Sequence, residues 1–437
     1  MNVQMTIRIA GREVETVERT ISGDAFEREE EAHRLGKEVG RVVAEQALGE
    51  LAEQHQRTPH CCGRPMNSRG LVPITVQGLD GPLTIRRRRY RCVQCQRNFY
   101  PVDGSLLCGC HRVTRPLAKK ACQLATMEHF TELPQLLFDQ HGVRLCHAEL
   151  IELAHDVGGA ADRLRQADAK RWNETVSCQR EWPAAQIQSR RVYVSCDGIM
   201  YCTNLREPDP QHPGEQRLIW QQMRVGCVYW QDEHDHWHKQ ILWGRESAEE
   251  FGASLYRLAR RCGYRQAQEK IFAADGGDWC WTIHQTYFAD ASGILDWYHA
   301  NEHVWTCAKT LFSDQAEITT WAKQALQHMR EEGGYGLLKW LLEQQPRLRN
   351  KKRKALASLI HYVQPRQDRM DYPRYRHHGW QIGTGMIEST AKQLVGLRLK
   401  GPGMHWSEQV AIAITALRAH SLNHNWNQSW KTPVLNC

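Results

Sequence analysis

Short apolar runs alternate with helical patterns between residues 190 and 304, and two of these runs lead into aspartate. Asp197 lies in RRVYVSCDGIMY and Asp275 in KIFAADGGDW. Three consecutive strand patterns are followed by a helix, a strand, a second helix and a last strand, which predicts an α/β region built on one sheet. Asp197 would end the first, central strand and Asp275 the fourth, beside it. Their carboxylates would then share one edge of the sheet despite 78 residues (275 − 197) between them.

A third acidic residue, Glu388, opens a helical pattern in GTGMIESTAKQ, 113 residues (388 − 275) after Asp275. Residues 305–375, between them, are helical and basic and carry no strand pattern. This order matches an RNase H-like core with an all-α insertion. Asp-Gly is also an ordinary turn signal, but carboxylates gathered at one edge suit hard cations. The sequence therefore predicts two Mg²⁺ (or Mn²⁺) ions held by Asp197, Asp275 and Glu388.

Basic residues are concentrated in two segments. Residues 345–403 hold 13 Lys and Arg against three acidic residues, a surplus of +10 (13 − 3) in a chain of net charge +8. A second basic run lies in TIRRRRYRC. Such clusters are typical of a partner with a phosphate backbone, although a solvated helix face is the alternative for each. The predicted DNA contacts are Arg86, Arg87, Arg88, Arg89, Lys351, Lys352, Arg353, Lys354, Arg398 and Lys400.

Cysteines and β-rich patterns mark residues 57–111 as a small zinc-ribbon-like module. Cys92 and Cys95 form a C-x2-C pair, and Cys62 is the most favoured partner. Pro59 stands where a second C-x2-C pair would begin. His60 or Cys61 must then supply the fourth zinc ligand, unless LCGCHR (residues 107–112) supplies ligands instead. A metal-free β-module is the alternative.

Helical patterns flank this module. Residues 24–56 predict one long amphipathic helix, for packing or oligomerisation. Residues 112–185 contain a helix, a turn centred on Gly142 and a helix opening near Cys146 and His147, the outline of a helix-turn-helix DNA-binding region. No apolar stretch approaches the length of a membrane span, and the first residues carry no signal-peptide core. We therefore expect a cytoplasmic protein.

Four motifs make the chain resemble a bacterial insertion-sequence transposase of the DDE type, in the Mutator-like superfamily and its ISKra group. They are VSCDGIMY, AADGGDWCW, LDWYHANEHVW and GTGMIESTAKQLVGLRLKGPGMHWS. The resemblance implies that Asp197, Asp275 and Glu388 are the catalytic acids. It makes Asp296 and His299, a D-x2-H motif, accessory residues. Asp278 is the neighbour that could be mistaken for the second acid.

The resemblance also implies partners. The terminal inverted repeats of the element and the target DNA would be bound, by a homo-oligomer in the bacterial nucleoid. Lys392, four residues after Glu388, would contact the scissile strand or pair with Glu388. An RNase H-like nuclease without strand transfer, a domesticated DNA-binding protein and a zinc-ribbon regulator are the alternatives. The expected segments are 1–56 (helical), 57–111 (zinc-ribbon-like), 112–185 (helix-turn-helix), 186–304 (core), 305–375 (insertion) and 376–437 (last core helix and tail).

Overall fold

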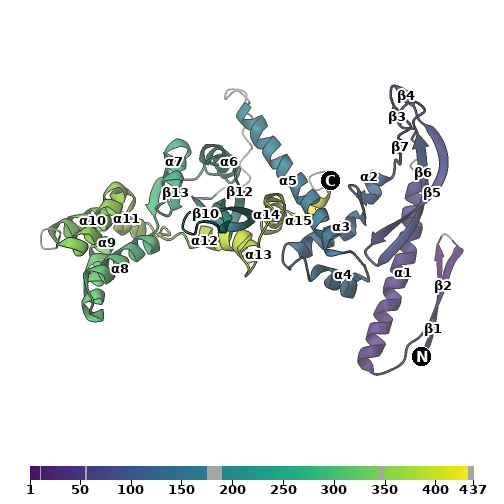
Figure 1. Cartoon of the computed structure of the whole chain (residues 1–437), viewed down its shortest axis with the longest axis horizontal. Coiled ribbons are helices and arrows are strands. Elements are labelled where there is room, and N and C mark those ends of the chain that lie inside the picture. The colour runs from purple at the N-terminus through teal and green to yellow at the C-terminus, as the bar shows by residue number, and fades with distance from the viewer. Residues whose placement is uncertain (10, 55–56, 175–188, 345–348, 432–437) are drawn as a thin grey trace. The chain divides into compact units, whose positions relative to one another are not determined.

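The computed structural model describes the chain except residues 10, 55–56, 175–188, 345–348 and 432–437 (Figure 1). Two compact units, both mixing helices and strands, divide the chain. The first contains Met1–Leu164, Glu408–Arg418 and Asn425–Cys437, and the second contains Arg165–Ser407 and Ala419–His424. Among the described residues, no helix is long and apolar enough to cross a bilayer. The expected boundary at residues 185 and 186 lies outside the described residues.

The N-terminus is not wholly helical, which corrects the prediction for residues 1–56. Strands β1 (Asn2–Ile9) and β2 (Arg12–Thr20) form an antiparallel hairpin before helix α1 (Ala25–Gln54). Apolar residues alternate along NVQMTIRI, a period-two pattern that favours a strand. Helix α1 begins with a reciprocal cap. The amide of Glu27 donates to Asp24 Oδ1 at 2.9 Å and the amide of Asp24 donates to Glu27 Oε2 at 3.0 Å.

A five-stranded sheet in the order β7-β6-β5-β9-β8 forms the predicted β-module. Its long hairpin is β5 (Asn67–Gly78) and β6 (Gly81–Arg91), and alternate residues such as Leu83 and Ile85 are buried beneath α1. The alternation of GPLTIRRRRYR therefore sends its apolar side chains to one face. The remaining short elements are β3 (His60–Cys61), β4 (Arg64–Pro65), β7 (Asn98–Phe99), α2 (Asp103–Leu106), β8 (Leu107–Cys108) and β9 (His111–Thr114).

Three helices follow the module: α3 (Arg115–Ala125), α4 (Leu133–His141) and α5 (His147–Glu174). Helix α4 ends at Gly142, whose φ of 64° is left-handed and favours glycine. The predicted helix, turn and helix are therefore present at the predicted residues. Their contact with DNA stays a prediction.

The second unit is built on a five-stranded mixed sheet in the order β12-β11-β10-β13-β14. Strand β10 is central, antiparallel to β11 and parallel to β13, and β13 is parallel to β14. The predicted central place of the first strand, with the fourth strand beside it, is therefore observed. The strands are β10 (Arg191–Pro208), β11 (Gln216–Gln231), β12 (Trp237–Gly244), β13 (Glu269–Ala274) and β14 (Ser292–Leu295).

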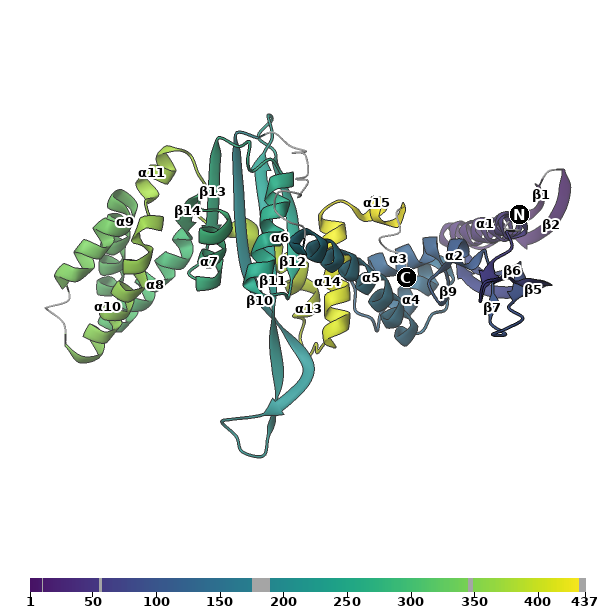
Figure 2. The same cartoon turned by 90° about the horizontal axis from the view of Figure 1, so that it is seen from above.

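Strand β10 does not end at Asp197, which corrects the prediction. It continues to Pro208, paired with β11 as far as Gln216, because the hairpin outlasts the shorter parallel neighbour β13. Figure 2 shows β10 and β11 continuing as a two-stranded ribbon past the other strands. What ends near Asp197 is the parallel pairing with β13, whose last pair joins Ser195 to Ala273.

Helices cover both faces of this sheet. Gly226 in β11 lies against α6 (Ala248–Arg261), where an added Cβ would meet Leu255 at 2.8 Å. The next residue, Cys227, lies against α12 (Gly385–Ala391), with Thr390 Oγ1 4.0 Å from its Sγ. Successive residues of a strand point to opposite faces, so α6 and α12 lie on opposite sides of the sheet. Helix α7 (Asp278–Tyr287) joins β13 to β14.

In its described residues the insertion contains helices and no strand, as predicted, and its first helix already begins at Trp297, before the predicted start at residue 305. It consists of α8 (Trp297–Leu311), α9 (Gln315–Gln344), α10 (Asn350–Val363), the 3₁₀ turn η3 (Gln364–Arg369) and α11 (Tyr372–His377). Helix α9 kinks at Gly333, whose φ is 72°. An added Cβ there would lie 2.8 Å from the carbonyl oxygen of Met370, so the kink lets η3 pack against the helix.

The RLKGPGMHW segment packs onto the base of the β10–β11 ribbon. The amide of Trp406 donates to the Cys202 carbonyl at 3.1 Å, and the amide of Asn204 donates to the Trp406 carbonyl at 2.9 Å. Arg398 is buried at 2% exposure with its guanidinium 4.8 Å above the Trp406 ring. The predicted DNA contact at Arg398 is therefore wrong, because its side chain belongs to the core. The last elements are η4 (Lys392–Gly396), α13 (Leu397–Leu399), α14 (Glu408–Leu422) and α15 (Trp426–Lys431).

Candidate metal centres

Strand register places three aspartates in one row. Ser195 pairs with Ala273 across β10 and β13. Two residues further along the chain stand Asp197, still in β10, and Asp275, the first residue after β13. Ala274 pairs with Leu295 across β13 and β14. The residue that follows Ala274 is Asp275, and the residue that follows Leu295 is Asp296. Residues in one row of a parallel sheet point to the same face. By this register Asp197, Asp275 and Asp296 all stand just past the parallel pairing, at the carboxyl edge of the three strands.

Asp197 carries the clearest electrostatic signature of the row. Its Oδ1 accepts the amide of Gly198 at 2.6 Å. Burial, together with the charges of Asp275 and Glu388, raises the pKa of Asp197 to about 6 against the opposing charge of His299. Negative charges that are close enough to raise one another's pKa disfavour their own ionised forms, and a cation among them would relieve that cost. The donor set and its charge thus fit a divalent metal.

Asp275 occupies the turn between β13 and α7. Its Oδ1 accepts the amide of Gly277 at 3.0 Å, and its carbonyl accepts Trp281 Nε1 at 3.0 Å. These bonds fix the turn and leave Oδ2 without a hydrogen bond among the described residues. Asp278, the neighbour that could displace it, points elsewhere: its side chain is 97% exposed and lies 3.4 Å from Arg366 Nη2.

Glu388 comes from the first turn of α12, and its amide donates to the Thr384 carbonyl at 3.0 Å. Its Oε1 lies 2.7 Å from the hydroxyl of Thr384. Within the described residues, the oxygens of Asp197, Asp275 and Glu388 do not all lie within 4.8 Å of one another. The structure therefore brings the three acids into electrostatic range but not into one closed ligand cage.

The accessory residues take different positions. Asp296 is buried at 1% exposure and caps α8 by accepting the amide of His299 at 2.7 Å. His299 acts on the pKa of Asp197 through its charge, so it lies near the row. Lys392 is exposed one turn after Glu388, and within the described part of the chain it forms no ion pair with it. Of the two predicted roles for Lys392, the pairing is not observed.

Helices α8 and α10 and the turn η3 supply three neighbours of the row that the sequence did not reveal. His303 stacks on Tyr362 with ring centroids 3.8 Å apart and meets the His299 ring edge-to-face, with ring centroids 5.0 Å apart. Arg366 donates to the Gly276 carbonyl at 3.0 Å. Burial raises the pKa of Tyr362, and the charges of Asp275 and Asp296 act in the same direction. His303, four residues after His299 on one helix face, was the only signal available in the sequence.

The two predicted basic segments differ in accessibility. Lys351, Lys352, Arg353 and Lys354 open α10 and are all exposed, and Lys400 is exposed as well. In the β-module, Arg87 is mostly buried, paired with Asp103 and placed 3.8 Å over the Tyr100 ring. The predicted DNA contact at Arg87 is therefore corrected, because its charge is already engaged in the fold.

The rest of the β-module run is mixed. Arg86 is exposed, whereas Arg88 and Arg89 are half-buried. Arg88 Nη1 donates to Ser68 Oγ at 3.3 Å, and Arg89 Nε is buried without a hydrogen-bond partner among the described residues. Because strand residues alternate between faces, four consecutive arginines cannot all point to one partner.

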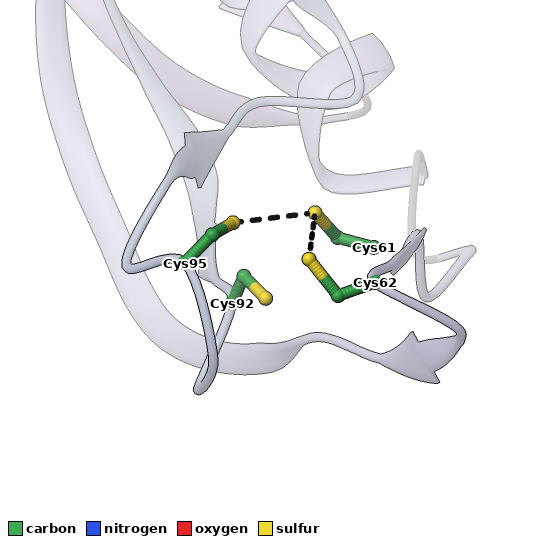
Figure 3. A group of neighbouring side chains, drawn as sticks. All are labelled: Cys61, Cys62, Cys92 and Cys95. Atoms are coloured by element: carbon green, nitrogen blue, oxygen red, sulfur yellow. Dashed lines mark hydrogen bonds between the residues drawn. The ribbon is translucent and has the colours of Figure 1, made fainter.

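Four cysteines converge at the tip of the β-module: Cys61, Cys62, Cys92 and Cys95 (Figure 3). Their sulfur atoms all lie within 4.8 Å of one another, with Cys61 Sγ 3.5 Å from Cys95 Sγ and 3.8 Å from Cys62 Sγ. Left-handed residues turn the chain at both ligand pairs, with φ of 50° at Cys62 and 59° at Gln96. Four convergent thiols are a donor set that suits tetrahedral Zn²⁺.

Cys61 completes this set, and His60 does not, which corrects the predicted ligand at His60. His60 lies in the two-residue strand β3, opposite Pro65, and its neighbour Cys61 turns inward instead. The Arg97 amide, together with Cys61, lowers the pKa of Cys95 to about 7, and the same contact with Cys95 raises the pKa of Cys61 to about 12. A thiol that ionises near neutral pH is a ready metal ligand.

The alternative ligands of LCGCHR form a separate group. Cys110, His111 and Asp156 lie within 4.8 Å of one another. His111 Nε2 is 2.9 Å from Asp156 Oδ2, and His155 Nδ1 is 3.0 Å from the other oxygen of the same carboxylate. This arrangement ties β9 to α5 by ordinary hydrogen bonds. Cys110 and His111 therefore do not contribute to the four-thiol cluster.

Comparison with known proteins identifies no family for this chain. No family model matches the chain, and no curated protein matches it either. Among solved structures, the Drosophila P element transposase strand transfer complex aligns with 73% of this chain and 81% of its own, at 10% identity and a TM-score of 0.23. A TM-score this low does not show a shared fold. The functional argument therefore depends on the residues of this chain.

Proposed function

We propose that this protein is a DDE transposase with an RNase H-like core, of the Mutator-like ISKra group, which cleaves and joins DNA strands with divalent metal ions. The observation that carries the proposal is the shared row of Asp197 and Asp275 with Glu388 in electrostatic range. Residues 78 positions (275 − 197) apart reach one edge because parallel register brings them there. Asp197 and Asp275 are half-buried and Glu388 is exposed. The charges of Asp275 and Glu388 disfavour the ionised form of Asp197, and a cation would relieve that cost, which supports a metal site.

In this proposal Asp197, Asp275 and Glu388 hold two Mg²⁺ or Mn²⁺ ions. Such a pair, when bound, activates a nucleophilic water or 3′-hydroxyl and stabilises the leaving oxygen. The Gly198 and Gly277 amides orient Asp197 and Asp275 by hydrogen bonds at 2.6 and 3.0 Å. Asp296 and His299 are accessory residues, and no covalent protein–DNA intermediate is needed. Positioning and charge neutralisation then provide most of the rate enhancement.

DNA is the proposed partner, as terminal inverted repeats and as target. Lys351, Lys352, Arg353 and Lys354 present four exposed cations in one turn of α10. Exposed Arg86, Lys392 and Lys400 and the helix pair α4–α5 are further proposed contacts. A homo-oligomer on DNA would join two transposon ends. The four-thiol cluster is proposed to hold one structural Zn²⁺ that stabilises the tip of the β-module.

The test is strand transfer from a pre-cut DNA end carrying the terminal repeats of the element, with Mg²⁺ or Mn²⁺. The wild-type protein should join this end to target DNA, and Asp275→Asn should not. Joining by Asp275→Asn would refute the acid assignment. Cleavage by the wild type without joining would instead identify an RNase H-like nuclease. Absence of both activities with intact DNA binding would identify a domesticated DNA-binding protein.

A further inference from the structure

Asp296 ties together three segments that surround the acidic row. Its amide donates to the Ala274 carbonyl at 2.9 Å, which holds it against β13. Its Oδ1 accepts the amide of His299 at 2.7 Å and so begins α8. Its Oδ2 accepts the backbone amide of Thr384 and contacts the Thr384 hydroxyl. Both side chains are buried, at 1% for Asp296 and 3% for Thr384.

Thr384 stands at the N-cap of α12 but does not cap it. A threonine in this position normally accepts an amide of its own helix through its side-chain oxygen. Here the Thr384 side chain makes no such bond, and its hydroxyl lies between two carboxylates instead. One belongs to Asp296 and the other, at 2.7 Å, is Oε1 of Glu388. The hydroxyl therefore contacts the side chain of Glu388, the third acid, and does not cap the helix.

The neighbouring glycines fit this placement. An added Cβ at Gly383 would lie 2.8 Å from the ring of Tyr298 and 3.9 Å from Asp296 Oδ2, so the turn approaches Asp296 closely. The Trp297 amide donates to the Ile382 carbonyl at 2.9 Å and fixes the same turn. Backbone contacts of the neighbouring residues thus fix the position of Thr384 independently of its contact with Glu388.

A hydroxyl carries one hydrogen and donates it to one acceptor at a time. The Thr384 hydroxyl is within donating distance of both carboxylates, so its one hydrogen is shared between Asp296 Oδ2 and Glu388 Oε1, while the Thr384 backbone amide stays bound to Asp296 in either case. Oε2 of Glu388 makes no hydrogen bond within the described residues, so this oxygen stays open. We propose that Asp296, acting through Thr384, positions Glu388 so that one carboxylate oxygen is fixed and the other is presented to a divalent cation.

This inference rests on the proposed function, because it takes Glu388 as a metal ligand. Asp296 and Thr384 are positioning residues in it, and neither touches the metal. Residues that orient a ligand typically change metal affinity or activity by about 10- to 100-fold when the orienting bond is removed. The effect should depend on the hydroxyl alone, and not on the size of the side chain at position 384.

Three variants at position 384, Thr384→Ser, Thr384→Val and Thr384→Ala, separate the hydroxyl from the methyl group, and a fourth variant, Glu388→Gln, tests the ligand itself. Mn²⁺ alone is titrated into the full-length protein, and free Mn²⁺ is measured by electron paramagnetic resonance. We expect Thr384→Ser to bind like the wild type and both Thr384→Val and Thr384→Ala to bind about 10- to 100-fold more weakly. Wild-type affinity in Thr384→Val and Thr384→Ala would overturn the inference. Having two variants without the hydroxyl guards against one that fails to fold.

Different results would overturn the role of Glu388 as a metal ligand and the positioning role of Asp296 and Thr384. If Glu388→Gln binds Mn²⁺ as tightly as the wild type, Glu388 is not a ligand, and both the acid site and the positioning role are overturned. If Glu388→Gln binds weakly but Thr384→Val does not, the acid site stands and only the positioning role is overturned. Strand cleavage gives a second readout: raising the Mn²⁺ concentration should restore much of the activity of Thr384→Val, whereas a general structural defect would not respond to metal.

Discussion

The acidic row and the four-thiol cluster collect their side chains in opposite ways. The row stands at the ends of regular strands, and their register brings Asp197 and Asp275 to one sheet edge across 78 residues (275 − 197). The cluster is built by two tight turns with left-handed residues, where one residue decides which side chain faces inward. A site on a sheet edge is therefore fixed by the whole fold, whereas a site on turns is fixed by its ligands and their metal.

This difference implies different consequences of metal removal. The core beneath the acidic row contains many fully buried side chains, among them Val192, Val194, Ile271 and Phe272. The tip that carries the thiols has a small core in which Met66, Tyr90 and Cys92 are the buried residues. A small core gives little stability of its own. Zinc loss should therefore disrupt its own tip, and loss of the divalent cations should leave the sheet folded.

The largest expected effect is on zinc binding. Structural zinc contributes about 10 to 16 kcal/mol of apparent binding free energy in small domains near neutral pH. Cys61→Ser should therefore reduce the bound zinc, measured by mass spectrometry of the purified protein, and increase proteolysis of residues 57–101. His60→Ala is the matched control and should retain one zinc per chain. Full zinc occupancy in Cys61→Ser, or its loss in His60→Ala, would restore the histidine ligand that the sequence allowed.

The second effect concerns catalysis at the row. Asp197→Asn keeps the shape of the side chain but removes its charge, so strand transfer should fall by more than about a thousandfold. The exposed Asp278→Asn is the matched control, because its side chain points away from the row, and it should retain activity within about a factor of three. Zinc content should be unchanged in both. A comparable loss of activity in Asp278→Asn would indicate that Asp278, and not Asp275, is the second catalytic acid.

The third effect is a pH-dependent gain in stability. The pKa of Asp197, raised to about 6 in the fold, means that the ionised form is disfavoured there. Its contribution to stability is present below the unfolded-state pKa and is lost as pH rises through the folded value. In metal-free protein, Asp197→Asn should therefore raise the free energy of unfolding by up to about 3 kcal/mol at about pH 8.

The same substitution should give almost no gain at about pH 4, where the wild-type carboxyl is protonated in the fold. Denaturant unfolding of metal-free protein at the two pH values measures the difference. Saturating Mg²⁺ should reverse the order of stability, because only the wild type then gains the full metal contribution. An equal gain at both pH values would mean that packing, and not charge, causes it.

The sequence predicted those parts of each site that lie on regular strands or helices, and it did not predict the parts that lie on turns. Alternation and helical spacing predicted the strand order around β10, and with it the meeting of Asp197 and Asp275. They did not predict Tyr362 and Arg366, because contacts between an insertion and a turn leave no periodic signal. Nor could spacing decide between His60 and Cys61, since the choice depends on a tight turn that leaves no periodic pattern in the sequence. Arg87 and Arg398 were misjudged because charge counts do not reveal partners such as Asp103 or the Trp406 ring.

The smallest expected effect extends the comparison to the two basic segments. Replacing Lys351, Lys352, Arg353 and Lys354 together by alanine should weaken DNA binding and reduce its salt dependence. The slope of log K against log salt should become shallower by about 0.9 for each DNA phosphate that the variant no longer neutralises. Fluorescence anisotropy of labelled terminal-repeat DNA over a range of salt concentrations measures this slope.

Arg87→Ala is the counterpart in the β-module. Its guanidinium is paired with Asp103 and stacked over Tyr100, so its removal should lower the free energy of unfolding and leave the salt slope unchanged. The exposed residues Lys351 to Lys354 would then bind DNA, and the buried Arg87 would stabilise the fold, although both lie in basic stretches of sequence. A reduced salt slope in Arg87→Ala would show instead that its pair with Asp103 opens on DNA, and the distinction between the two segments would fail.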